Sequence, residues 1–221
     1  MTVVDLQGPA GRLEARLDLP PAERKIDPAG LVAAAAPAGP RAVVVLAHPH
    51  PQMGGTMHTK ALYQAAKAFT RIECAVLRFN FRGCGTGTYT DGVGEMDDCR
   101  AAIDFVAGRF PGTHVWCGGM SFGAWVGMTV AAGDPRVSTL IGIAPPISHY
   151  DFETVRAATK PKFFIHGEFD EVCPVKELRT FYARAADPKE LVVIDSADHL
   201  FDGKVSEVAD AVEDLFGDWN E

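Results

Sequence analysis

From residue 41 to the C-terminus, short apolar runs rich in β-branched residues alternate with segments of helical length. The runs are continuous rather than alternating with polar residues, which is typical of parallel strands covered on both faces. This pattern predicts an α/β fold with a mostly parallel, twisted sheet and helices on both faces. The expected strands are residues 42–47, 75–79, 114–117, 137–143, 162–166 and 191–194. The expected helices are residues 59–70, 95–109, 122–132, 175–185 and 204–216.

The first forty residues follow a different pattern. Residues 2–19 hold two partly alternating runs around Gly8-Pro9-Ala10-Gly11, which predicts an antiparallel hairpin at the edge of the sheet. Residues 20–40 are rich in Ala, Pro and Gly, so we expect a surface connection with a short strand or turn in its middle. Because 221 residues is a normal length for one α/β domain, we expect a single domain over residues 1–221.

Charge and cysteine content narrow the classes of partner. The chain has 29 acidic and 21 basic residues and a net charge of −8, which disfavours nucleic acid and anionic membranes as partners. The N-terminus lacks an apolar signal segment and no apolar run is long enough to span a bilayer, so we expect a cytoplasmic protein. The five cysteines are scattered and never form Cys-x-x-Cys, which indicates reduced thiols rather than disulfides or a zinc site.

The segment Gly119-Met120-Ser121-Phe122-Gly123 lies between an expected strand and an expected helix and matches the pattern Gly-x-Ser-x-Gly. Small residues at both ends of the pattern let the strand and the helix approach closely around a sharp turn. The turn would place Ser121 at the carboxyl edge of the sheet, beside a helix N-terminus that favours developing negative charge. Ser121 is therefore the candidate nucleophile. Its alternative role is the N-cap of that helix, where serine is common.

A serine nucleophile needs a histidine base, and in folds with this elbow the chain order is Ser, then Asp or Glu, then His. The histidines after the elbow are His149, His166 and His199. His166 ends an apolar run and should lie in or at the edge of the sheet, and His149 follows the strand at 137–143. His199 follows the last expected strand, from where a loop residue can reach back over the sheet edge. We therefore predict His199 as the base.

The base must be held in the correct tautomer by a carboxylate. Asp170 lies just beyond the carboxyl end of the expected strand at 162–166 and is the candidate acid. Its competitors are Glu168, Asp195 and Asp198. Asp198 is discounted because it directly precedes the histidine, and neighbouring side chains diverge. The alternative role for Asp170 is to cap the helix that begins near Pro174.

Acyl transfer also needs two N–H donors for the developing oxyanion. One is the backbone N–H after the nucleophile, that of Phe122, and the other comes from the loop after an earlier strand. That loop begins His48-Pro49-His50-Pro51-Gln52. Its prolines have no N–H, which leaves His50 as the first candidate and Gln52 as the second.

Two further patterns are weaker. His48, His50 and His58 lie close in the chain, but no carboxylate or further ligand stands at a typical spacing, so we predict no metal. Gly83, Gly85 and Gly87 repeat half of a dinucleotide-binding pattern, but residue 88 is Thr and no acidic residue ends a following strand. We therefore expect no nucleotide cofactor, and interpret this stretch as a loop lining the pocket.

Together these segments resemble the α/β-hydrolase superfamily and, more closely, small bacterial predicted serine esterases related to dienelactone hydrolase. The resemblance runs from about Arg41 to the C-terminus. It rests on His48-Pro49-His50-Pro51 with Gly54-Gly55-Thr56-Met57-His58, on residues 77–83, on the elbow, on His166-Gly167 through Asp170, and on Asp198-His199-Leu200-Phe201. It implies an α/β-hydrolase fold and a serine hydrolase.

Dienelactone hydrolases have a cysteine nucleophile, so lactone chemistry is not implied. Leu200 stands where we expect an aromatic residue, which changes one wall of the pocket.

Many members of the superfamily carry a helical lid where this chain has residues 144–161, a stretch that fits only a turn and one short helix. We therefore expect an open site, lined by Met120, Trp125, Pro146 and Phe169 and suited to short, soluble acyl esters as small-molecule substrates. Thioesterase, peptidase and acyltransferase activities would use the same residues. A catalytically silent binding protein on this fold is the alternative from another class.

Overall fold

The computed structural model describes residues 2–21, 24–26, 32–34, 39–85 and 87–219. Its main sheet has the strand order β1-β2-β6-β5-β7-β8-β9-β10. The strands from β6 to β10 are parallel to one another, which confirms the predicted α/β sheet. These are β5 (Ala42–Ala47), β6 (Ala75–Phe79), β7 (His114–Met120), β8 (Val137–Ile143), β9 (Lys162–Gly167) and β10 (Lys189–Ile194).

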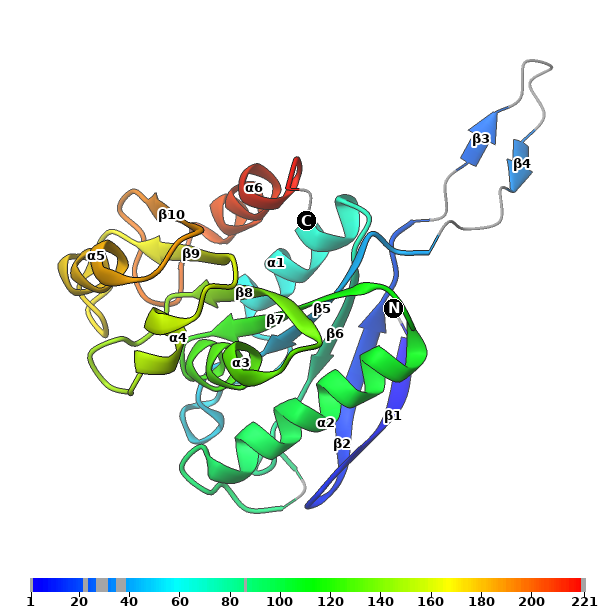
Figure 1. Cartoon of the computed structure of the whole chain (residues 1–221), viewed down its shortest axis with the longest axis horizontal. Helices are drawn as coiled ribbons and strands as arrows, with labels where there is room; N and C mark the ends of the chain where they lie inside the picture. The colour runs from blue at the N-terminus through cyan, green and yellow to red at the C-terminus, as the bar shows by residue number, and fades with distance from the viewer. Residues whose placement is uncertain (1, 22–23, 27–31, 35–38, 86, 220–221) are drawn as a thin grey trace.

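Helices cover both faces of the sheet (Figure 1). The helices are α1 (Lys60–Arg71), α2 (Val93–Arg109), α3 (Phe122–Gly133), α4 (Glu153–Ala157), α5 (Val175–Arg184) and α6 (Val205–Phe216). Apolar side chains of α1 and α6 fill the core on one face, and those of α2 and α3 fill the core on the other. Trp116 of β7 packs between Phe69 and Phe216, with ring centroids at 6.3 and 5.3 Å. Burying each such ring stabilises the fold by roughly 2–3 kcal/mol.

The predicted hairpin at the N-terminus is present at the sheet edge. Strands β1 (Thr2–Gly8) and β2 (Gly11–Asp18) pair antiparallel, and β2 pairs antiparallel with β6. Leu6, Leu13 and Leu17 face the core, as the alternating pattern requires. Between residues 20 and 40, β3 (Arg24–Ile26) and β4 (Val32–Ala34) form a separate antiparallel pair, where we expected a single strand or turn. Residues 22–23, 27–31 and 35–38 lie outside the described residues.

The centre of the sheet contains the point at which the chain reverses its direction of winding. From β5 the chain continues to β6 on one side and then returns to β7 on the other. In parallel sheets, ligands bind in the crevice beyond the carboxyl ends of the strands at such a point. The loop that begins with His48 follows β5, and Ser121 follows β7. The topology therefore brings Ser121 and the predicted oxyanion loop to the same crevice.

Strand β7 is three residues longer than predicted. We expected it to end at Cys117, but Gly118, Gly119 and Met120 continue the parallel ladder opposite Ile141, Gly142 and Ile143. Glycine has both the backbone N–H and the backbone C=O that the ladder needs. Gly118 and Gly119 therefore remain part of the sheet, which continues to the residue before Ser121.

The segment between β8 and β9 contains the short helix α4, which confirms that the fold has no large lid. Among the described residues, none of the helices has the length and apolar character needed to cross a bilayer.

Candidate active site

Ser121 occupies a sharp turn between β7 and α3. Its backbone has φ 53° and ψ −124°, a conformation that non-glycine residues rarely adopt and that requires support from the surrounding structure. Close packing supplies that support, because a Cβ on Gly119 or Gly123 would lie 2.2 or 2.3 Å from the carbonyl oxygen of Ala47. The Ser121 N–H also donates to the carbonyl of Ile143, at the end of β8. Ser121 is at the N-cap position, but its side chain makes no capping hydrogen bond.

The three predicted triad side chains form one continuous hydrogen-bonded chain. Ser121 Oγ lies 2.8 Å from Nε2 of His199, and Nδ1 of His199 lies 2.7 Å from Oδ2 of Asp170. A carboxylate only accepts, so Nδ1 carries the proton and donates it to Asp170. Nε2 is then free to accept the hydrogen bond of the Ser121 hydroxyl. This is the arrangement that a serine nucleophile and its base require.

Asp170 is held from two sides. Its Oδ1 accepts the N–H groups of Val172 and Cys173 at 2.9 and 2.8 Å, so the loop-capping role and the contact with His199 occur together on one carboxylate. Burial raises the pKa of Asp170, but the hydrogen bonds from His199 and Cys173 outweigh it and leave the pKa below its ordinary value. The carboxylate therefore remains ionised at neutral pH.

The competing carboxylates have other partners. Glu168 accepts the backbone N–H of Ser196, Asp195 is exposed, and Asp198 accepts the N–H groups of Leu200 and Asp202. Asp198 therefore orders the loop that presents His199 rather than contacting the imidazole. Phe201, fully buried, anchors the same loop in the core.

Among the described residues, neither of the other downstream histidines forms a hydrogen bond with Ser121. His166 is buried in β9, as predicted, and donates from Nε2 to the carbonyl of Cys173 at 2.7 Å, while the same nitrogen lies 3.5 Å from Oδ2 of Asp170. His149 is exposed in the loop after β8.

Of the two predicted oxyanion donors, His50 lies on the loop after β5 and Phe122 is the first residue of α3. The ring of His50 packs against the ring of Phe122 with centroids 5.0 Å apart. Among the described residues, neither backbone N–H has a hydrogen-bond partner, whereas the Gln52 N–H donates to Nδ1 of His50 at 3.3 Å. The geometry therefore favours His50 over Gln52 as the second donor.

Comparisons with known proteins match this geometry. The family model described as serine aminopeptidase, S33, matches residues 38–156, more than half of the chain. The chain belongs to the α/β serine hydrolases. A serine hydrolase homologue from Coxiella burnetii is 31% identical, with a TM-score of 0.84 and 97% of both chains covered. XC6422 from Xanthomonas campestris, a serine hydrolase without a lid, is 30% identical, with a TM-score of 0.84 over 96% of this chain and 92% of that one.

A curated relative, the uncharacterized protein RP471 of Rickettsia prowazekii, is 31% identical over 97% of this chain and 88% of its own length. More distant structures with this fold include esterases at 25% and 17% identity. None of these comparisons tests the closer resemblance to dienelactone hydrolase, which stays a prediction.

Aromatic rings pack around the first residue of α3 in this hydrolase. The ring of Phe122 lies 5.0–5.9 Å from five others, those of His50, Phe81, Tyr89, Trp125 and Tyr150. Trp125 and Tyr150 stack at 4.3 Å, and the Trp125 indole N–H donates to the carbonyl of Asp151. Gly92 has to be glycine here, because a Cβ would lie 2.4 Å from the Trp125 ring. Phe81 and Phe122 are buried in the core, and His50, Tyr89, Trp125 and Tyr150 are the half-buried rings of this packed cluster.

The expected pocket residues differ in accessibility. Phe169 is exposed and Trp125 half-buried, so both can contact a ligand, whereas Pro146 is buried. The expectation for Met120 needs correction: its side chain is fully buried in the core shared with α1 and α6. Consecutive residues of a strand face opposite sides of a sheet, so proximity to Ser121 in sequence did not place Met120 in the site.

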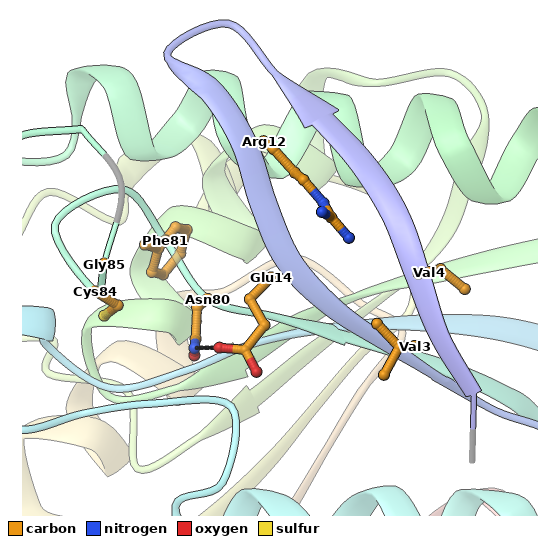
Figure 2. A pocket seen from close by; sticks show the side chains of 8 residues that line it. All are labelled: Val3, Val4, Arg12, Glu14, Asn80, Phe81, Cys84 and Gly85. Carbon is orange, nitrogen blue, oxygen red and sulfur yellow. Dashed lines mark hydrogen bonds between the residues drawn. The ribbon is translucent and has the colours of Figure 1, made fainter.

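The glycine-rich stretch lines a pocket, but on the side facing the N-terminal hairpin. Cys84 and Gly85 face Val3, Arg12 and Glu14 across a pocket of about 270 Å³ (Figure 2). Asn80 also lines this pocket, and its amide donates to the Glu14 carboxylate at 2.9 Å. No triad residue lines this pocket. Thr86 of the stretch lies outside the described residues.

The histidines of the front loop have structural partners. His48 is fully buried, accepts the Phe81 N–H at Nε2 and donates from Nδ1 to the Pro49 carbonyl. His50 accepts the Gln52 N–H at Nδ1, so its Nε2–H donates to the hydroxyl of Tyr89 at 2.8 Å. Among the described residues, no group of three or more His, Cys, Asp or Glu side chains is arranged to hold a metal ion.

Sequence reasoning missed the part that Tyr89 plays. Its hydroxyl holds the ring of His50, and the two rings pack with centroids 4.8 Å apart. No local pattern connects two residues that are 39 positions apart. The one available signal was that Tyr89 closely follows the glycine-rich stretch, which we expected to line the pocket.

His48 should make stability depend on pH. Burial lowers its pKa to about 4 in the folded protein, against 6.5 in the unfolded chain. The stabilisation that comes from burying a neutral His48 is therefore fully present above pH 6.5, the pKa in the unfolded chain, and is lost as the pH falls towards 4. Between pH 7 and pH 5, the free energy of unfolding should fall by about 2 kcal/mol more in the wild type than in His48→Gln. Urea unfolding at both pH values measures this difference.

An equal fall in both proteins would contradict the assignment. An NMR titration of the wild type provides an independent check, because the His48 ring should stay neutral down to about pH 5.

Proposed function

We propose that this hydrolase cleaves carboxylic esters through an acyl-enzyme formed on Ser121. Ser121 Oγ attacks the carbonyl carbon while His199 takes the hydroxyl proton, and the backbone N–H groups of Phe122 and His50 receive the oxyanion. The C–O bond to the alcohol then breaks, and His199 delivers the proton to the departing oxygen. Water, activated by the same imidazole, releases the acid and restores Ser121. The continuous chain of hydrogen bonds from Ser121 to Asp170 is the observation that carries this proposal.

The aromatic rings around Phe122 favour substrates with a short acyl group. We expect kcat/KM to be about tenfold or more higher for p-nitrophenyl butyrate than for the laurate ester. Trp125→Ala is the matched variant, because it opens the packed space without touching the triad. It should raise the ratio of laurate to butyrate hydrolysis. Faster hydrolysis of the laurate by the wild type would contradict the proposal.

Amide hydrolysis is the second candidate, favoured by the description of the matching family model as a serine aminopeptidase. Alanine p-nitroanilide and p-nitrophenyl acetate separate the two. An esterase hydrolyses the acetate with a much higher kcat/KM, whereas an aminopeptidase prefers the anilide. Activity on neither, from a correctly folded protein, would support the silent binding protein.

A further inference from the structure

Large apolar side chains are exposed on the two loops that carry the acid and the base. Phe169 directly precedes Asp170 and is 61% exposed, and Leu200 directly follows His199 and is 49% exposed. The loops lie side by side, because the N–H of Phe169 donates to the carbonyl of Ala197 at 2.8 Å. Exposed apolar side chains gathered at one place indicate a contact surface. This surface lies next to the imidazole of the triad.

The position of this surface identifies the part of the substrate that meets it. His199 must hand its proton to the departing oxygen, so the leaving group lies on the His199 side of the nucleophile. The acyl group lies on the other side, beside Phe122. Phe169 and Leu200 therefore belong to the leaving-group side of the site.

The same two loops carry a strong excess of negative charge. Besides Asp170, residues 168–173 and 195–203 include five carboxylates and no Lys or Arg. The five are Glu168, Glu171, Asp195, Asp198 and Asp202. Lys204 follows the second loop but lies 3.2 Å from Glu207. Lys176, exposed in the first turn of α5, and Lys60, at the start of α1, are two cations at the same end of the sheet against the five carboxylates. A cleft lined by one sign of charge attracts ligands of the opposite sign and repels those of the same sign.

We propose that the leaving-group side of this site selects esters of apolar alcohols or phenols that are neutral or cationic and discriminates against anionic ones. The inference rests on the proposed ester hydrolysis and goes beyond it by defining the leaving group. An ester or a thioester is therefore a poor substrate when its leaving group bears a phosphate or a sulfonate. The carboxylates act mainly on the rate at which a charged substrate reaches the site. The preference therefore weakens as the salt concentration rises and screens these charges.

Three acetate esters with the same acyl group test the charge preference. They are 3-acetoxy-N,N,N-trimethylanilinium, 3-tert-butylphenyl acetate and 3-acetoxybenzenesulfonate, which are cationic, neutral and anionic. Each kcat/KM is divided by the rate of the same ester with imidazole, which corrects for leaving-group reactivity. In 10 mM salt the cation should exceed the anion by about tenfold or more, and 0.5 M NaCl should reduce this contrast to about threefold or less.

A pair of triple variants locates the source of the contrast. Glu171→Gln with Asp195→Asn and Asp202→Asn removes three exposed charges from the two loops, without touching a hydrogen bond to the triad. The control removes three exposed charges at the opposite end of the sheet, through Glu73→Gln, Asp187→Asn and Glu190→Gln. The first variant should lose most of the contrast and keep its activity on the neutral ester within about twofold. The control should retain the contrast.

The apolar part of the surface has its own test. Phe169→Ala should lower kcat/KM for 3-tert-butylphenyl acetate by about tenfold and leave that for methyl acetate nearly unchanged, because only the aryl ester reaches the ring. An equal loss of kcat/KM on both esters would show that Phe169 does not contact the leaving group.

The outcomes separate this inference from the proposed function. Failure of the wild type to hydrolyse the neutral ester through Ser121 would overturn ester hydrolysis itself. Hydrolysis of the neutral ester with a contrast near one, or with the sulfonate preferred, would overturn the charge selection alone. So would an equal loss of contrast in both triple variants. The salt dependence of the wild type tests the proposal even if a variant does not fold.

Discussion

His199→Ala is expected to lower kcat for p-nitrophenyl acetate by about 10⁴-fold or more. The imidazole accepts the Ser121 hydroxyl at Nε2, and without it the hydroxyl has no base to take its proton. His149→Ala is the matched control, since it removes an exposed imidazole from the loop after β8. The control should keep kcat within about threefold, because surface substitutions away from a site have small effects. Steady-state kinetics of both variants measure this.

A loss of less than about tenfold in His199→Ala would show that another group acts as the base. Far-ultraviolet circular dichroism of the variant must match the wild type, so that a loss of activity reports chemistry rather than unfolding.

Asp170→Asn should lower kcat by about 10⁴-fold while the fold remains intact. The reason lies in the loop: Oδ1 of Asp170 accepts two backbone N–H groups, so the amide oxygen of asparagine must take that position. Its NH₂ group then faces Nδ1 of His199 and requires that nitrogen to accept. The proton moves to Nε2, where it blocks acceptance from the Ser121 hydroxyl.

Glu168→Gln provides the control for this prediction. It removes the same charge from the same loop, and glutamine can still accept the N–H of Ser196. Activity on a neutral ester should stay within about threefold. If Glu168→Gln lost far more activity than Asp170→Asn, the acid of the triad would be Glu168.

Local sequence patterns were sufficient for most of the sheet and for the sharp turn that presents Ser121. Buried parallel strands are continuous apolar runs, so β5, β6 and β8 have the predicted bounds. The elbow is encoded locally as well, because Gly119 and Gly123 are the neighbours that the turn requires. The chain order of acid and base then selected two loops at the carboxyl edge of the sheet. In the structure, the His199 imidazole from one of these loops forms a hydrogen bond to Asp170 from the other at Nδ1 and one to Ser121 at Nε2.

What sequence could not provide is the direction of side chains and the contacts between distant loops. Met120 is next to the nucleophile in the chain but points to the opposite face of the sheet. Tyr89 holds His50 only because the loops after β6 and β5 converge at the crevice. The second role of Asp170, as acceptor for its own loop, is likewise visible only in three dimensions.

The proposed leaving-group side and the proposed acyl side place different demands on the two halves of an ester. In this proposal the aromatic rings around Phe122, through the half-buried Trp125, limit the volume of the acyl group. The exposed Phe169 and Leu200 offer apolar surface to the alcohol, and the carboxylates around them act by their charge. Because no large lid covers the site, these side chains are the elements through which substrate choice can be altered.

Labelling with a fluorophosphonate probe tests the central claim most directly, since the probe reacts only with a serine activated by its base. The folded protein should form a covalent adduct, and peptide mass spectrometry should place it on Ser121. Ser121→Ala should give no adduct, and His199→Ala should label far more slowly than the wild type. Absence of labelling in the folded wild type, or an adduct that persists in Ser121→Ala, would contradict the account.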